Sequence, residues 1–313
     1  MRYKSIDALK AICAFLIVCI HIPFKIIGGY YVALTRIGVP IFLMISGYFY
    51  KKDKTKRQIK KIAILFIEAN ILYCVWDCIY GLFSGSFPVI NLKSLMKFVL
   101  LNESPFSGHL WYLGAILYTL IIVYMLDKIG CKKVMYWITP VLLIGDLIFG
   151  KYSILIFGRE FPYILVRNWL FVGIPYFSIG MLMQDKRFRF GKWGIPVFAF
   201  ATIFERYLLV SNGLNATRDQ YISTTFLAIA VFSFALEYKG KVSEKLSQIG
   251  QNYSTWIYSI HPIFITIFTW LISKIGAERI WGHIGPIVVF TASLMFVASV
   301  TKLKNVLLIN KRL

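Results

Sequence analysis

The chain has 313 residues, of which 58% are hydrophobic and 17% aromatic, and its mean hydropathy is +0.68. This composition excludes an ordinary soluble globular domain and predicts an all-α, polytopic membrane protein. The net charge of +21 matches the Lys and Arg excess of cytoplasmic loops in membrane proteins, so we expect no nucleic-acid partner.

Hydropathy predicts about ten transmembrane helices, in one domain that covers residues 1–313. The second and sixth contain Gly38-Val39-Pro40 and Gly173-Ile174-Pro175, which favour broken helices. The expected ranges are 7–27, 36–50, 61–83, 109–126, 134–149, 169–184, 194–210, 219–236, 253–272 and 285–303.

Basic residues set the orientation. With the N-terminus inside, the N-terminal and cytoplasmic segments (51–61, 127–133, 186–192, 239–245 and the tail from 302) hold 23 of the 35 basic residues, and the outer loops hold eight. This asymmetry puts both termini in the cytoplasm of a multi-pass plasma-membrane protein. In the longest outer loop, 84–107, residues 92–100 predict a short amphipathic helix on the membrane surface.

The first expected span contains Asp7, Lys10 and His21. Eleven residues at about 100° each return a helix to within roughly 20° of its start, so Lys10 and His21 share a face. Ionisable groups in a span cost about 2.5–3.5 kcal/mol each, which points to a bundle interior or a water-filled path. Asp7 and Lys10 are close enough to pair. Lys10 is either a snorkelling lysine or a phosphate or carboxylate contact that Asp7 orients.

The other ionisable candidates are less distinctive. His109, His261 and His283 are each more simply explained as hydrogen-bonded or loop histidines. No His/Cys spacing suits a metal, and the five cysteines suit apolar packing. The basic run 51–61, expected to be a loop, is first an orientation signal, and could also hold a polyanionic donor such as a nucleotide-bearing thioester.

Six fragments in order resemble the acyltransferase-3 family of bacterial integral membrane acyltransferases, over essentially the whole chain. The family's opening pattern, an Asp, a basic residue three later and a His after ten more residues, is matched by Asp7, Lys10 and His21. The other five fragments are Arg36 to Tyr48 with Ser46-Gly47, Arg57-Gln58-Ile59-Lys60, His109-Leu110-Trp111-Tyr112-Leu113, Arg167-Asn168 through Gly180, and Tyr258-Ser259-Ile260-His261-Pro262.

The resemblance implies an acyl-CoA-dependent O-acyltransferase with no bound cofactor. It would move an acyl group, acetyl in the first instance, from cytoplasmic acyl-CoA to a hydroxyl of a surface or cell-wall glycan or a small acceptor outside. His21 would be general base or transient acyl carrier, with Asp7 and Lys10 orienting the donor. Lys10, Arg36, Arg57 and Lys60 would bind CoA, and the cavity would include Ser46, His109, Trp111, Tyr112, Asn168, Tyr258 and His261.

Two features keep other functions open. Lys10 and Lys60 stand where the family often has Arg, so bidentate binding of phosphate is lost there. Residues 37–50 and the start of the third span are also similar to the membrane halves of vancomycin-resistance serine racemases. The competing hypothesis is therefore a transporter of serine or another small polar solute, with broken helices lining a path.

Overall fold

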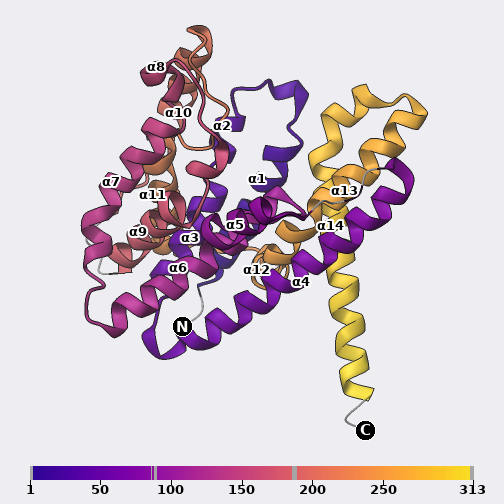
Figure 1. The fold of residues 1–313 in the computed structure, drawn as a ribbon, viewed down its shortest axis with the longest axis horizontal. Coiled ribbons are helices and arrows are strands. Elements are labelled where there is room, and N and C mark those ends of the chain that lie inside the picture. The colour runs from indigo at the N-terminus through magenta and orange to yellow at the C-terminus, as the bar shows by residue number, and fades with distance from the viewer. Residues whose placement is uncertain (1–2, 86, 88–89, 185–188, 311–313) are drawn as a thin grey trace. The chain divides into compact units, whose positions relative to one another are not determined.

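The computed structural model describes residues 3–85, 87, 90–184 and 189–310, and every regular element within them is a helix (Figure 1). The predicted all-α class is confirmed for this part of the chain. The chain forms two compact units, Met1–Gly38 with Val231–Leu313, and Val39–Ala230. Residues 186–188 of one expected cytoplasmic segment lie outside the described residues.

The first unit combines helices from both ends of the chain. Around Val18, Ile22 and Val289, the helices α1, α13 and α14 bury an apolar core that includes Phe264 and Phe268. Its elements are α1 (Lys4–His21), η1 (Lys25–Ile27), α2 (Val32–Thr35), α12 (Glu244–Asn252), α13 (Ser254–Ile275) and α14 (Glu278–Asn310).

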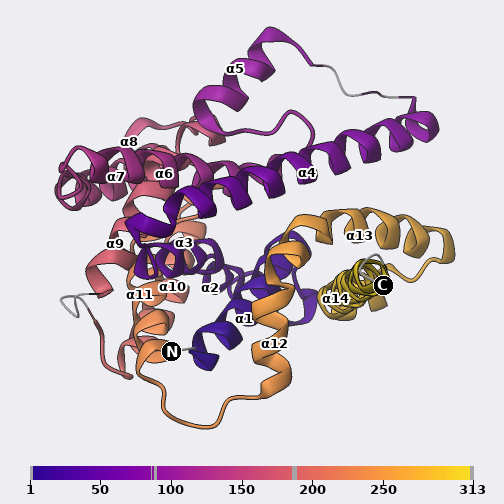
Figure 2. The same ribbon diagram turned by 90° about the horizontal axis from the view of Figure 1, so that it is seen from below.

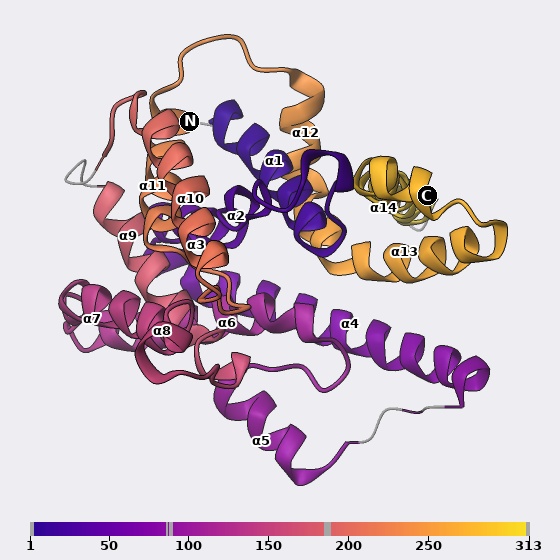
Figure 3. The same cartoon turned by 90° about the horizontal axis from the view of Figure 1, so that it is seen from above.

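A glycine lets α1 and α12 touch through their backbones, and Figure 3 shows the two helices side by side. A Cβ built on Gly250 would lie 1.7 Å from the carbonyl oxygen of Asp7 and 2.9 Å from the amide nitrogen of Ala11. No side chain fits there. An exposed ion pair also joins the two helices, with Lys4 Nζ of α1 2.5 Å from Glu244 Oε2 of α12.

The second unit is built around α6, which packs against α4 and η4, while α7 packs against α9. Its elements are α3 (Gly38–Tyr48), α4 (Lys52–Ser84), α5 (Leu92–Leu101), η2 (Gly108–Leu110), α6 (Trp111–Lys128), α7 (Val134–Phe149), α8 (Ser153–Phe157), η3 (Tyr163–Leu165), η4 (Trp169–Gly173), α9 (Ile174–Gln184), α10 (Gly194–Ser211) and α11 (Ile222–Glu237), the last of which continues into the first unit.

Two glycines bring α3 and α9 into mutual backbone contact. A Cβ on Gly47 would lie 2.0 Å from the carbonyl oxygen of Phe177, and a Cβ on Gly180 would lie 2.1 Å from that of Met44. Small residues at helix crossings are typical of membrane proteins, because close packing replaces the hydrophobic effect between helices. The Ser-Gly and Ser-Ile-Gly fragments singled out in the sequence therefore meet each other.

Five helices are long and apolar enough to cross a membrane: Lys52–Phe83, Gly108–Lys128, Gly194–Ser211, Ser254–Ile275 and Glu278–Lys304. Four shorter apolar helices, Val32–Tyr48, Val134–Phe149, Trp169–Gln184 and Ile222–Glu237, coincide with four more expected spans. The remaining expected span is α1, which carries Lys4, Asp7 and Lys10. Helix thus occurs at all ten expected positions.

Two expectations about helix ends are wrong. The span expected at 7–27 is one α-helix only as far as His21, because Pro23 has no amide hydrogen to continue the ladder, and the short η1 turn at Lys25–Ile27 is separate. His21 consequently lies in the last helical turn, and its side chain is exposed. The basic run 51–61, expected to be a loop, is helical from Lys52 onward as the start of α4, which Figure 2 shows as one unbroken helix.

The short helix expected at 92–100 is confirmed as α5. Asn91 and Ser94 cap its first turn reciprocally, with the Ser94 amide donating to Asn91 Oδ1 at 2.9 Å and the Asn91 amide donating to Ser94 Oγ at 3.0 Å. Leu92, Val99 and Leu100 are exposed, as expected for a helix that lies on a membrane surface.

We expect Gly47→Ala and Gly180→Ala each to destabilise the protein by about 1–3 kcal/mol, because the added methyl group meets a backbone carbonyl that cannot move aside. Thermal unfolding of the purified protein in detergent measures the effect. Gly191→Ala is the matched control, since nothing lies within 4 Å of a Cβ at Gly191. Equal midpoints for all three variants would show that the crossing is not as tight as the structure indicates.

Candidate functional site

The cationic group of the first helix is neutralised locally. Lys10 Nζ donates to Asp7 Oδ1 at 3.1 Å, across one turn of α1, with Asp7 mostly buried and Lys10 about a quarter exposed. The predicted pairing is therefore present. Because the Asp7 carbonyl also faces Gly250 of α12, the pair has a rigid support on its backbone side.

The histidine of α1 contacts a second histidine from α13. The ring centroids of His21 and His261 are 5.1 Å apart, and the two planes are inclined by 49°. His261 is completely buried, whereas His21 is exposed. Both residues are predicted site residues, and the structure brings them together within one unit.

Backbone carbonyls fix the tautomer of His261. Its Nδ1 lies 2.8 Å from the carbonyl oxygen of Tyr258 and 3.2 Å from that of Ile257. A carbonyl can only accept, so Nδ1 carries the proton and, in the neutral imidazole, Nε2 is the acceptor nitrogen. The Tyr258 ring lies 6.2 Å from the His261 ring. These contacts hold the imidazole that supports His21 in a single orientation.

The basic residues of α4 lie on its exposed first turns. Arg57 and Lys60 are three residues apart, so they share one helix face, and both are exposed. This end of α4 is tied to the end of α6, because the Tyr50 hydroxyl donates to Asp127 Oδ2 at 2.9 Å and Lys52 Nζ donates to the Asp127 carbonyl at 3.0 Å. Arg36, at the end of α2, is half-buried.

His109 belongs to a polar group at the start of the α6 helix. The distance between Ser107 Oγ and His109 Nδ1 is 2.6 Å, and the buried Tyr73 ring of α4 meets the imidazole edge-on with centroids 4.8 Å apart. Neither Ser107 nor Tyr73 was selected from the sequence. A lone serine in a loop, or a tyrosine within an apolar helix, belongs to no sequence motif that would mark it as a site residue.

Arg167 borders the same turn. Its Nη2 donates to the Gly108 carbonyl at 3.3 Å. Its guanidinium carbon lies 4.2 Å from the Tyr163 ring centroid and 5.5 Å from the Trp111 ring centroid. Trp111, expected in the substrate cavity, is buried against this cation. Arg167 was noted in the sequence only as part of a family fragment.

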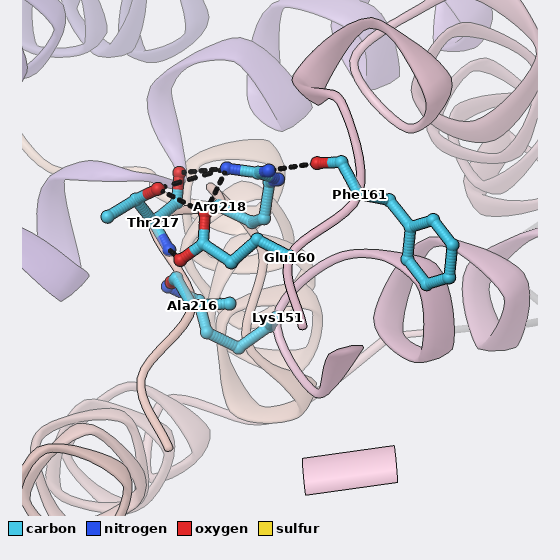
Figure 4. A network of polar contacts seen from close by, with 6 residues as sticks. All are labelled: Lys151, Glu160, Phe161, Ala216, Thr217 and Arg218. Carbon is cyan, nitrogen blue, oxygen red and sulfur yellow. Dashed lines mark hydrogen bonds and ion pairs between the residues drawn. The ribbon is translucent and has the colours of Figure 1, made fainter. Parts of the chain in front are cut away.

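A second arginine, Arg218, packs against Tyr163. Figure 4 shows the polar contacts that Arg218 makes with its other neighbours. Arg218 Nη1 lies 2.9 Å from Glu160 Oε2, and Arg218 also donates to the Phe161 carbonyl. The Thr217 amide and hydroxyl donate to the two Glu160 oxygens, each at 2.8 Å. Burial alone would raise the pKa of Glu160, but these hydrogen bonds and the Arg218 charge lower it, so Glu160 is ionised at neutral pH.

Two asparagines fix the geometry around these groups. Asn168 Oδ1 accepts from the Leu170 and Phe171 amides at 2.9 and 3.1 Å, which caps η4. Buried Asn102 donates to the Trp111 carbonyl and accepts from the Trp169 amide, each at 2.9 Å. Asn102 was not predicted from the sequence. Its φ is 56°, in the left-handed region that asparagine adopts more readily than most residues other than glycine. A cavity role for Asn168 stays a prediction.

The remaining predicted cavity residues lie in the second unit. Ser46 Oγ donates to the Phe42 carbonyl at 3.0 Å within α3, and the Tyr112 and Phe42 rings lie 6.0 Å apart. Two local groups of predicted residues thus form, His21 with His261 and Tyr258 in the first unit, and His109 with Trp111 in the second. Asp7 with Lys10, and Arg57 with Lys60, lie on other helical turns. Within the described residues, no three His, Cys, Asp or Glu side chains could hold a metal ion.

Comparison with known proteins adds a family relationship. A family model described as an acyltransferase domain matches residues 3–302. An amino-acid racemase of Enterococcus faecalis is 25% identical over 299 residues, which cover 85% of this chain and 41% of the racemase. A serine/alanine racemase of Enterococcus gallinarum is 24% identical over 306 residues, 88% of this chain and 43% of its own. The chain thus spans less than half the length of these relatives. No solved structure matches.

Proposed function

Because the chain belongs to the acyltransferase-3 family, we propose that it transfers an acyl group, acetyl in the first instance, from cytoplasmic acyl-CoA to a hydroxyl of an extracytoplasmic acceptor. The acceptor is a surface or cell-wall glycan or a small hydroxyl compound. The observation that carries this proposal is the contact of His21 with a buried, tautomerically fixed His261. Such an imidazole pair suits proton transfer at neutral pH.

In the proposed reaction, His21 takes the proton of the acceptor hydroxyl as its oxygen attacks the thioester carbonyl carbon. The carbon–sulfur bond breaks, the acyl ester forms, and the proton passes to the departing CoA thiolate. If His21 carries the acyl group transiently, its imidazole nitrogen first attacks the thioester carbonyl carbon, and the carbon–sulfur bond breaks as CoA departs with the imidazole proton. The acceptor oxygen then attacks the acyl carbon, the carbon–nitrogen bond to His21 breaks, and the hydroxyl proton returns to the imidazole. Asp7 and Lys10 orient the donor, and Lys10, Arg36, Arg57 and Lys60 bind its phosphates.

The proposed topology has ten spans in a bacterial plasma membrane, with both termini in the cytoplasm. We expect a reporter fused after Leu313 to read cytoplasmic and one inserted in 84–107 to read external, because most basic residues lie in the segments assigned to the inside. Enzymatic reporters active on one side only make the measurement. A cytoplasmic signal from the second fusion would overturn the ten-span arrangement.

We expect His21→Ala to fold and insert normally, since it removes an exposed polar group, and to lower the turnover number by about 10² or more, as for a lost general base. The measurement is acyl transfer by purified protein in liposomes. His283→Ala is the matched control, because His283 is also exposed and has no proposed role. Full turnover by His21→Ala, with transfer intact in the control, would remove His21 from the mechanism.

For the donor, we expect Arg57→Ala and Lys60→Ala each to raise the apparent KM for acyl-CoA about tenfold, the equivalent of a charge-assisted hydrogen bond of about 1.4 kcal/mol. Lys56→Ala, an exposed cation on another face of the same turns, is expected to leave KM unchanged. A uniform effect of all three variants would indicate general electrostatic attraction instead of a phosphate site.

Similarity to two racemases, at 25% and 24% identity, favours a second candidate, a transporter of serine or another small polar solute. Both candidates use buried ionisable groups and broken helices. The discriminating observation is whether solute movement consumes acyl-CoA. Uptake of radiolabelled serine by liposomes that contain no acyl-CoA would support transport and reject acyl transfer as the primary activity.

A further inference from the structure

Arg167 is held in place by aromatic faces. Its guanidinium carbon lies close to the rings of both Tyr163 and Trp111. Within the described part of the chain, its side chain makes one hydrogen bond, to the Gly108 carbonyl, which fixes its direction. Cations are stabilised over aromatic rings, and more strongly where water is excluded. The group is therefore positioned rigidly although it is only half-buried.

Its charge, unlike that of its neighbour, is not balanced. Among the described residues, no carboxylate is within ion-pair distance of Arg167, whereas Arg218, on the same Tyr163 ring, is paired with Glu160 at 2.9 Å. Lys151, nearby in the chain, donates to the Ala216 carbonyl at 2.8 Å and lies 4.2 Å from the Tyr221 ring centroid. The fold thus pairs the charge of one arginine on this ring with a carboxylate and leaves the charge of the other without one.

A guanidinium has five N–H donors in a planar fork that matches the two oxygens of a carboxylate or phosphate. The carbonyl of Gly108 accepts from only one of them. Packing against two rings reduces the water around the cation and so strengthens its attraction for an anion. If Arg167 only packed between Trp111 and Tyr163, its planar cation would be sufficient and its remaining N–H donors would have no role.

We infer that Arg167 binds an oxyanionic group, a carboxylate or a phosphate, of the acceptor. The site lies beside His109, because the carbonyl that Arg167 contacts belongs to the residue immediately before it. The assignment to the acceptor rests on the proposed function. It narrows the acceptor class to acidic hydroxyl compounds, such as sugar acids, phosphorylated sugars or hydroxy acids.

The test compares glucuronate, glucose 6-phosphate and glucose, which differ in the charged group. Tryptophan fluorescence of the protein in phosphatidylcholine nanodiscs gives the dissociation constants, since Trp111 lies against the site. We expect at least one charged sugar to bind tenfold or more tightly than glucose. Arg167→Ala should abolish this preference and Arg167→Lys should keep part of it. Arg159→Ala, an exposed arginine 5.0 Å from the Phe161 ring centroid, should behave as the wild type.

Three results would overturn the inference: no charge preference in the wild type, an unchanged preference in Arg167→Ala, or an equal loss in Arg159→Ala. A preference that disappears in phosphatidylglycerol nanodiscs would identify an anionic lipid headgroup as the occupant and reject the acceptor assignment. Thermal unfolding midpoints of the variants confirm that they are folded. The binding assay contains no acyl-CoA, so its outcome is independent of whether acyl transfer itself is observed.

Discussion

Contact between helix backbones at glycine is the constraint on which both units depend. In an apolar environment no hydrophobic force presses one helix against another, so helices associate where their surfaces come closest. Gly250 meets the Asp7 carbonyl in the first unit, and Gly47 and Gly180 meet the carbonyls of Phe177 and Met44 in the second. The turn of α1 that carries Asp7 and Lys10 therefore packs directly on the backbone of α12. Side-chain rotation cannot change the distance between these two helices.

That rigidity matters because the chain carries polar groups that an apolar bundle must satisfy. Lys10 has Asp7, His261 has two backbone carbonyls, and Arg218 has Glu160. Each arrangement removes part of the cost of placing a charge or a donor away from water. Arg167 differs from these groups, because within the described part of the chain no carboxylate pairs with its charge.

The sequence was sufficient for the helical class, the ten helix positions, the Asp7–Lys10 pair and the short helix α5, because each depends on local pattern. It failed at the end of α1, where continuous hydropathy hid the effect of Pro23, and at residues 51–61, where charge was mistaken for the absence of helix. Contacts such as His21 with His261, or Asn102 with Trp111 and Trp169, join distant segments. Hydrophobic periodicity in the sequence does not predict contacts of this kind.

The continuity of α4 has a mechanical consequence. The helix runs without a break from Lys52 to Ser84, and it carries both the basic turns at Arg57 and Lys60 and the Tyr73 ring that meets His109. Thirteen residues separate Lys60 from Tyr73, which at about 1.5 Å each is roughly 20 Å of straight helix. The helix therefore holds the cationic turns at a fixed distance from Tyr73. The distance between these turns and His109 changes only if α4 as a whole slides or tilts, and loop flexibility cannot produce that change.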